Sequence, residues 1–186
     1  YNNMKQSTNT KNTMSQYTIE VIQHSPISPI SPISPISPIS PCYPKHNIDQ
    51  INENLWLGIL VREEELEALN ITHVLSILDT HPMYNPKKFI TKFIKMKDSG
   101  HENIIPYLDE CYNFIDNAIR NNGRVYVHCQ CGFSRSPTIV IAYIMKKKQL
   151  HFDEALNFVS NKRPCICPNF GFNIALREWG GESVFF

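Results

Sequence analysis

The residues best suited to chemistry lie in one short segment, from His128 to Ser136. Cys129 is followed three residues later by Gly132 and six residues later by Arg135. A cysteine thiolate is a covalent nucleophile, and an arginine guanidinium can grip two oxygens of one phosphate group. This spacing predicts a site that holds a phosphate ester and attacks it with sulfur.

The segment lies between an expected buried strand, residues 124–128, and an expected helix, residues 136–148. Pro137 fits the first turn of that helix and Ser136 fits its N-cap. We therefore expect a tight loop whose N–H groups, together with the helix dipole, bind a phosphate dianion and favour the thiolate of Cys129. The expected phosphate-binding residues are Gln130, Cys131, Gly132, Phe133, Ser134 and Arg135.

Three residues in or beside the loop have further expected roles. His128 is expected to bond to the loop or to tune Cys129, and the alternative is a packed residue at a strand end. Ser136 is expected to help the thiolate leave during turnover, besides capping the helix. Cys131 has two interpretations, a redox partner of Cys129 or a bystander, and the bystander is favoured because a disulfide inside a tight loop would be strained.

Composition narrows the class of protein. The chain has 186 residues, which suits one domain, and its formal net charge of +1 argues against a general nucleic-acid binder. No apolar run approaches the ~20 residues that span a membrane. The six cysteines have no framework-like spacing and no secretory leader is apparent, so we expect free thiols in the cytoplasm, with the nucleus as a second compartment.

Residues 1–46 are predicted to be a low-complexity tail, and residues 47–186 the catalytic domain. Residues 25–39 are five copies of Ser-Pro-Ile. A proline at every third position prevents both helix and sheet, so an extended tether is expected. A passive spacer is the favoured role, and the alternative is a substrate of proline-directed kinases or a ligand of a Pro-binding module.

From residue 47 onward the pattern alternates between strands and helices. Strands are predicted within residues 51–60 and over residues 71–78, 89–96 and 124–128. Helices are predicted over residues 62–69, 105–120, 136–148 and 152–162. The alternation predicts an α/β fold with helices flanking a central, mostly parallel sheet. In the helix over residues 105–120 an apolar stripe places Asp109 and Asp116 on the solvent side.

The segment from His128 to Ser136 resembles the His-Cys-x5-Arg signature of the protein tyrosine phosphatase superfamily. Its Ser-Arg-Ser ending, together with Ala142-Tyr143-Ile144-Met145, resembles the dual-specificity phosphatases in particular. Further similarity comes from Leu55-Trp56-Leu57-Gly58, Arg163, Pro168-Asn169 and Gly171-Phe172, so that it covers about residues 47–180. The resemblance implies a small single-domain enzyme that hydrolyses phosphotyrosine, phosphoserine and phosphothreonine in proteins through a phosphocysteine, with no cofactor.

That family places a general acid on a loop about thirty residues before the nucleophile. Asp98 lies 31 residues before Cys129, in a loop where Gly100 would permit motion. Asp79, at a strand end, is a weaker rival, and Asp109 and Asp116 are poorer still. The sequence lacks a Trp-Pro-Asp loop and long inserts, which implies a cleft shallow enough for phosphoserine and phosphothreonine as well as phosphotyrosine.

Three alternatives stay open. A zinc module built on Cys129, Cys131, Cys165 and Cys167 has unusual one-residue spacings. A phosphate-binding pseudophosphatase would usually lack the nucleophile or the acid. A phosphoinositide or RNA 5′-phosphatase is less favoured because residues 130–134 contain no lysine. The expected partners are therefore phosphorylated proteins, protein kinases among them. A lysine run over residues 87–97 is expected to steer acidic substrates or to form a solvated rim.

Overall fold

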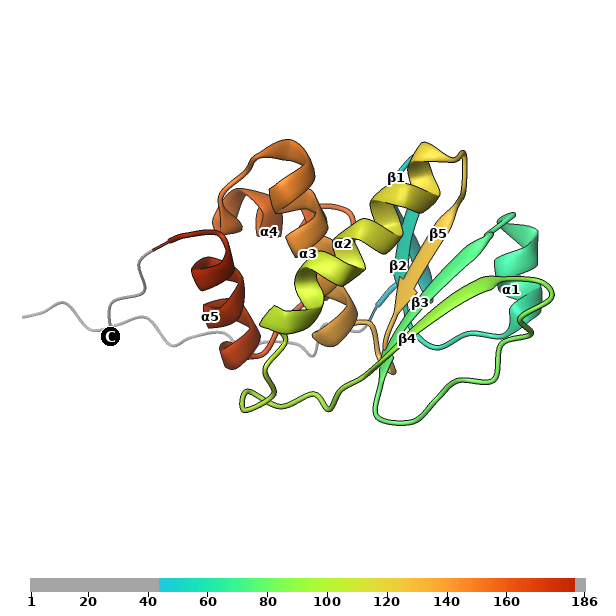
Figure 1. Cartoon of the computed structure of the whole chain (residues 1–186), viewed down its shortest axis with the longest axis horizontal. Helices are drawn as coiled ribbons and strands as arrows, with labels where there is room; N and C mark the ends of the chain where they lie inside the picture. The colour runs from blue at the N-terminus through green and yellow to red at the C-terminus, as the bar shows by residue number, and fades with distance from the viewer. Residues whose placement is uncertain (1–43, 183–186) are drawn as a thin grey trace, which may run out of the picture. The chain divides into compact units, whose positions relative to one another are not determined.

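The structure, a computed structural model, describes residues 44–182 (Figure 1). The Ser-Pro-Ile repeats lie outside the described residues, so their extended state and the division of the chain near residue 46 stay predictions. The elements, in chain order, are β1 (Ile48–Asn52), β2 (Leu55–Gly58), α1 (Glu63–Ala68), β3 (His73–Leu78), β4 (Ile90–Lys95), α2 (Ile105–Arg120), β5 (Val125–His128), α3 (Arg135–Lys148), α4 (Phe152–Ser160) and α5 (Phe170–Trp179).

The five strands within residues 44–182 form one sheet in the order β1-β2-β5-β3-β4. Among these strands β1 runs antiparallel to its neighbour and the other pairs are parallel, which confirms the predicted α/β fold with a mostly parallel sheet. The carboxyl ends of parallel strands share one edge, where ligands of such sheets bind. Cys129 follows β5 and Asp79 follows β3 directly, while Asp98 follows β4 by three residues, so the strands bring all three to this edge.

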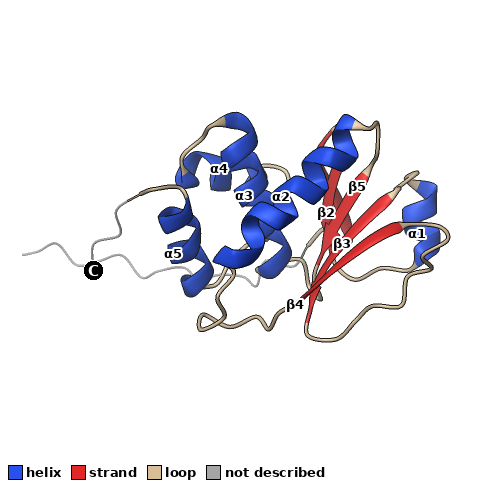
Figure 2. Cartoon of the chain, in the orientation of Figure 1, coloured by secondary structure: helices blue, strands red, loops and turns tan. Residues whose placement is uncertain are grey.

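Helices cover both faces of the sheet (Figure 2). Leu55 and Leu57 of β2 face the larger core, which is built with α2, α3, α4 and α5. Trp56, between them, faces a smaller core with Leu66 of α1 and Val74 of β3. Alternate residues of a strand point to opposite faces, so this short strand contributes to both cores. In the part of the chain that the structure describes, no helix is long and apolar enough to cross a membrane.

Two expectations about α2 and α3 are wrong. Asp116 was expected on the solvent side of α2, but it is only 4% exposed. Its carboxylate pairs with Arg120 at 2.7 Å and with Lys147 of α3 at 2.7 Å. The buried face of α2 therefore extends beyond the apolar residues and includes Asp116. Helix α3 begins at Arg135, with Ser134 at the N-cap position, so Ser136 does not cap it and lies inside the first turn.

Helix α5 was not among the predicted helices. Its N-cap is Asn169, whose side chain accepts a hydrogen bond from the backbone N–H of Phe172 at 3.0 Å. Phe172, Ala175 and Leu176 then recur at helical spacing and are buried against the larger core. An Asn N-cap followed by this spacing is the signal that would have revealed the helix.

Candidate active site

The loop between β5 and α3 turns its carbonyl groups outward. The carbonyl oxygens of Gln130, Gly132, Phe133 and Ser134 accept hydrogen bonds from Leu60, Arg163, Cys167 and Thr138, respectively. In a planar trans peptide, the C=O of one residue and the N–H of the next point in opposite directions. The N–H groups of residues 131 and 133–135 therefore point toward the centre of the loop. This arrangement can serve as a cradle for an anion.

The sulfur of Cys129 lies at the base of this cradle and is buried. It accepts a hydrogen bond from the backbone N–H of Gly132 at 3.2 Å and another from Oγ of Ser136 at 3.2 Å. Two donors on one sulfur suit a thiolate better than a thiol. The hydroxyl of Ser136 is directed at the reactive atom, which is the contact expected of a group that helps the thiolate leave.

Gly132 is the one loop position where a side chain cannot be placed. Its φ is +65°, and an added Cβ would lie 2.7 Å from the carbonyl oxygen of Gly58 and 2.7 Å from Nη2 of Arg163. Both the left-handed backbone and the close packing therefore require glycine here.

Arg135 begins α3 and points its guanidinium toward the same edge of the sheet. Its Nη1 donates to Oδ1 of Asp79 at 3.1 Å and to the carbonyl oxygen of Met96 at 3.1 Å. Its Nε lies 3.9 Å from Oδ2 of Asp98 and has no hydrogen-bond partner among residues 44–182. One nitrogen is thus anchored by protein, while an unpaired donor is available for a phosphate oxygen.

Asp79 contacts Arg135, and the sequence did not reveal this contact. A hydrogen bond from its own backbone N–H, followed by the one from Arg135, holds the pKa of Asp79 below its usual range. The carboxylate of Asp79 is engaged by Nη1 of Arg135 at 3.1 Å. The geometry therefore disfavours this rival for the acid and makes Asp79 an anchor of the guanidinium.

Asp98 lies beside the cradle, on the loop that joins β4 to α2. Its Oδ1 accepts hydrogen bonds from Oγ of Ser134 at 2.6 Å and from Nδ2 of Asn169 at 2.9 Å. The structure thus brings together Asp98, Arg135, Ser136 and Cys129, the four residues that the sequence singled out for catalysis. Asn169 was noticed only for its resemblance to a family segment, and its contact with the acid was missed.

His128 uses both ring nitrogens inside the protein. Nδ1 lies 3.3 Å from the carbonyl oxygen of Cys129, which can only accept, so Nδ1 carries the proton and Nε2 accepts from Oγ of Ser76 at 2.7 Å. The ring also stacks on Tyr126, with centroids 5.4 Å apart. Burial lowers the pKa of His128 to about 4, so the ring is neutral at pH 7. His128 is therefore packed and also contacts the carbonyl of Cys129, while its expected tuning of Cys129 stays a prediction.

Arg163 supports the cradle from behind and is fully buried. Its Nε donates to the carbonyl oxygen of Gly132 at 3.0 Å, while its Nη1 donates to Asp49 at 2.6 Å and to the carbonyl oxygen of His46 at 3.1 Å. One guanidinium therefore joins the phosphate loop to the segment around β1. Sequence reasoning gave Arg163 no such role, because its partners lie far away in the chain.

The remaining cysteines give the zinc hypothesis no support. Cys131 and Cys167 are exposed, and Cys165 is buried. Over residues 44–182 there is no group of three or more His, Cys, Asp or Glu side chains that could hold a metal ion. The redox role considered for Cys131 stays untested.

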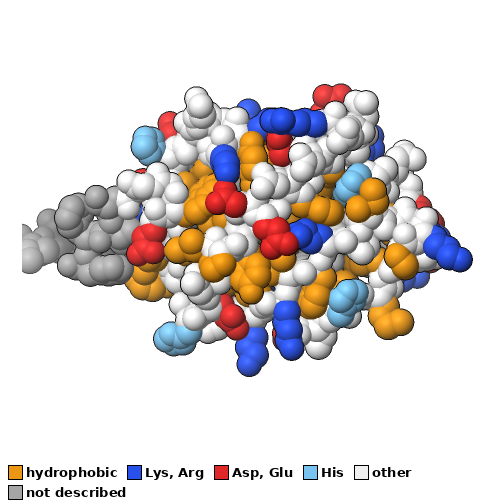
Figure 3. Space-filling model, in the orientation of Figure 1, with side chains coloured by type: hydrophobic (Ala, Val, Ile, Leu, Met, Phe, Trp, Pro, Cys, Tyr) orange, Lys and Arg blue, Asp and Glu red, His pale blue; other side chains and the backbone are white. Residues whose placement is uncertain are grey.

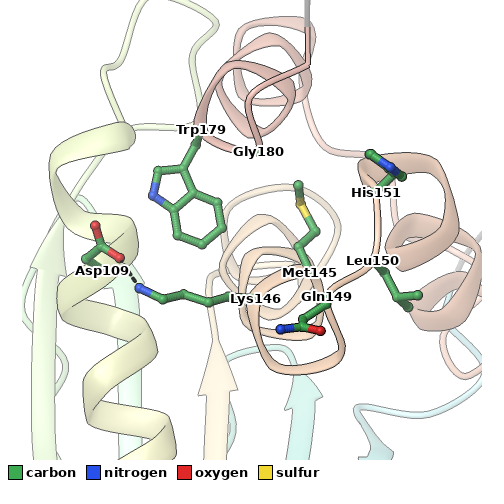
Figure 4. Close-up of a pocket in the computed structure, with 8 residues that line it drawn as sticks. All are labelled: Asp109, Met145, Lys146, Gln149, Leu150, His151, Trp179 and Gly180. Atoms are coloured by element: carbon green, nitrogen blue, oxygen red, sulfur yellow. Dashed lines mark hydrogen bonds and ion pairs between the residues drawn. The ribbon is translucent and has the colours of Figure 1, made fainter.

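A separate pocket lies away from the phosphate loop, between α2, α3 and α5 (Figure 4). It has a volume of about 460 Å³ and is lined by Met145, Leu150 and Trp179, with the Asp109–Lys146 ion pair at one side. None of its lining residues belongs to the cradle.

On the face shown in Figure 3, basic and acidic side chains are interspersed among apolar ones.

A mostly parallel sheet with a cysteine-based phosphate cradle at its carboxyl edge defines a class of phosphatases. The model of the family described as dual specificity phosphatase, catalytic domain, matches residues 56–182. The chain belongs to this family, and it is a dual specificity protein phosphatase, a hydrolase. The predicted family and enzyme class are thereby confirmed, and the lipid, RNA and pseudoenzyme alternatives are not favoured.

Individual relatives agree with this assignment. Dual specificity protein phosphatase 1B of Arabidopsis thaliana is 38% identical over 136 residues, which are 72% of this chain and 81% of the relative. Dual specificity protein phosphatase 16 of Homo sapiens is 41% identical over 128 residues, 66% of this chain but only 19% of that longer protein. The crystal structure of DUSP15 has 32% sequence identity and a TM-score of 0.69, over 73% of this chain and 88% of that one.

Proposed function

We propose that the protein dephosphorylates phosphotyrosine, phosphoserine and phosphothreonine in proteins through a phosphocysteine on Cys129. The observation that carries the proposal is the position of Sγ at the base of a cradle of inward N–H groups, with Gly132 and Ser136 donating to it. A phosphoryl group held by those N–H groups and by Arg135 would lie directly in front of the sulfur.

In the first step, the sulfur attacks phosphorus in line with the leaving group. The S–P bond forms while the ester P–O bond breaks, and Asp98 gives its proton to the departing oxygen. The loop N–H groups and Arg135 stabilise the charge on the three equatorial oxygens. The products are the free hydroxyl of the substrate and a phosphocysteine.

In the second step, water attacks the phosphocysteine. The new O–P bond forms, a proton of the water passes to the carboxylate of Asp98, and the electron pair of the S–P bond returns to Cys129. The hydroxyl of Ser136, which donates to Sγ at 3.2 Å, stabilises the departing thiolate. Inorganic phosphate is released, and the enzyme returns to its starting protonation state.

The substrates are proposed to be phosphorylated proteins, with protein kinases as one class. The Ser-Pro-Ile repeats are proposed as a spacer, with contact to a proline-directed kinase or a Pro-binding module as the alternative. The cytoplasmic or nuclear location stays a prediction.

Trapping of the phosphocysteine tests the mechanism. In Ser136→Ala, acid quenching during turnover of a ³²P-labelled phosphotyrosine peptide should leave label on the enzyme, because breakdown of the intermediate is slowed more than its formation. Cys129→Ser should hydrolyse no phenyl phosphate and retain no label, while keeping its fold. Normal turnover by the Cys129→Ser variant would overturn the proposal.

A substrate-trapping experiment addresses the choice of substrate. The Asp98→Ala variant should retain phosphoproteins from a lysate, because the cradle is intact while the proton donor is missing. Release of these proteins by vanadate, which competes for the cradle, separates trapped substrates from other bound proteins.

A further inference from the structure

Two hydrogen-bond donors converge on a single oxygen of Asp98. Oγ of Ser134 lies 2.6 Å and Nδ2 of Asn169 lies 2.9 Å from Oδ1. The other oxygen, Oδ2, lies 3.9 Å from Nε of Arg135. An oxygen that already accepts two hydrogen bonds is a poor place for a carboxyl proton. The proton that is delivered to a substrate therefore belongs on Oδ2.

The amide of Asn169 is held in one orientation by its other contacts. Its Oδ1 accepts from the backbone N–H of Phe172 at 3.0 Å, which caps α5, so its Nδ2 must be the atom that faces Asp98. The backbone N–H of Asn169 also donates to Oγ of Ser134 at 3.1 Å. The hydroxyl of Ser134 thus accepts from one side and donates to Asp98 on the other. These hydrogen bonds link Ser134, Asp98 and Asn169 in a closed ring.

A second contact holds the same loop against α5. A Cβ added to Gly171 would lie 2.1 Å from the carbonyl oxygen of Gly100, which is far closer than atoms can pack. The loop that carries Asp98 therefore rests directly on the backbone of the first turn of α5. Gly100 was expected to permit motion of this loop, whereas in the structure its carbonyl is part of the contact that fixes it.

We infer that Asn169 is a positioning residue for the general acid. Together with Ser134 it donates to Oδ1 of Asp98, and together with Gly171 it holds in place the loop that carries Asp98, here called the acid loop. This inference rests on the proposed role of Asp98. The first turn of α5 thereby becomes part of the catalytic arrangement, although it contributes no atom to the phosphate cradle.

The decisive variant is Asn169→Ser. Serine is a good N-cap, so the cap of α5 is kept, while the donor to Asp98 is lost. With phenyl phosphate, whose leaving group needs a proton, kcat should fall by about 10- to 100-fold, the usual size for the loss of one hydrogen bond to a charged group. With an aryl phosphate whose phenol is strongly acidic, kcat should fall less than about twofold, because little proton donation is needed.

A double-variant cycle separates positioning from general damage. If Asn169 acts through Asp98, then adding Asn169→Ser to Asp98→Asn should change kcat on phenyl phosphate no further. Gly171→Ala should show the same dependence on the leaving group as Asn169→Ser. Gly180→Ala is the control, because its added Cβ would meet the flexible end of Met145 at 2.7 Å and the carbonyl oxygens of Leu176 and Arg177 at 3.3 Å and 3.5 Å, none of which belongs to the acid loop. Thermal unfolding of each variant reports whether the fold is kept.

The outcomes are distinct. Equal losses on both esters, or a further loss in the Asp98→Asn background, would show that Asn169 merely stabilises the fold, and the inference would fail. Full activity of Asn169→Ser on phenyl phosphate, with Asp98→Asn impaired, would also overturn it and leave the proposed function intact. Full activity of Asp98→Asn itself would instead overturn the assignment of the acid.

Discussion

Oδ1 of Asp79 accepts a hydrogen bond from Nη1 of Arg135 at 3.1 Å, so the residue that follows β3 orients the guanidinium at the start of α3. The two residues are 56 positions apart in the chain. The Asp79 side chain is 61% exposed, whereas that of Arg135 is 9% exposed. The pair is therefore an anchor at the rim of the site, and its two members should respond very differently to substitution.

Arg135→Lys should lower kcat/KM by about 10²–10³, because an ammonium cannot replace the paired N–H donors that face the phosphate. Asp79→Ala should raise KM by no more than about fivefold and leave kcat nearly unchanged, since exposed ion pairs contribute at most about 1 kcal/mol. Steady-state kinetics with one aryl phosphate measure both variants. A loss in Asp79→Ala as large as that in Arg135→Lys would mean that Asp79 takes part in the chemistry.

Asp98→Asn should lower kcat on phenyl phosphate by about 10²–10⁴, the usual size of general-acid catalysis. The loss should shrink as the leaving group becomes more acidic.

Asp109→Asn is the control for this variant, since Asp109 is exposed and pairs only with Lys146 among the ion pairs of the described residues. Asp116 is unsuitable, because it is buried between Arg120 and Lys147 and its replacement would change stability. Undiminished activity of Asp98→Asn on phenyl phosphate would require another acid.

His128 should make the folded state lose stability in mild acid. Its pKa is about 4 in the folded protein, lowered by burial from an ordinary 6.5. As the pH falls through 6.5, the unfolded chain gains a proton that the folded chain does not bind until about pH 4. The free energy of unfolding should therefore be highest above pH 6.5, and His128 should account for a loss of about 2 kcal/mol between pH 7 and pH 5.

Urea unfolding at the two pH values checks this expectation. In His128→Gln the loss between pH 7 and pH 5 should be smaller by that amount, whatever the variant costs at pH 7. His101→Gln, at an exposed position, should keep the wild-type difference. An unchanged pH dependence in His128→Gln would contradict the neutral, buried state of the ring.

The buried contact between Arg163 and Asp49 predicts a contrast between two changes near the start of the chain. Removal of residues 1–41 should leave kcat on aryl phosphates unchanged, as the pattern of the tail suggests. Asp49→Ala should lower the free energy of unfolding by about 3–5 kcal/mol, because it leaves a fully buried guanidinium without its counter-charge. Denaturant unfolding measures the second effect, and a loss below about 1 kcal/mol would show that other groups compensate the charge.

The parts of the structure that follow from local pattern were predictable. The helix over residues 105–120 was predicted with the bounds that α2 has, because its apolar stripe is long. The phosphate loop was predicted because a strand, a glycine and a helix start lie within a few residues. The roles of Asp79, Asn169 and Arg163 were not, because their partners lie 56, 71 and 114 residues away. Residue spacing along a chain does not show which distant side chains meet.

The contacts of Arg163 also limit how far the N-terminal part of this enzyme can be truncated. The family match begins at residue 56, yet the guanidinium is paired with Asp49 and with the carbonyl oxygen of His46. A recombinant fragment trimmed to the family boundary would lose β1 together with Asp49 and His46, the partners of Nη1, while the charge stayed enclosed behind Gly132. We therefore expect the smallest unit able to fold and turn over substrate to include residue 46, which lies upstream of the region by which its relatives are recognised.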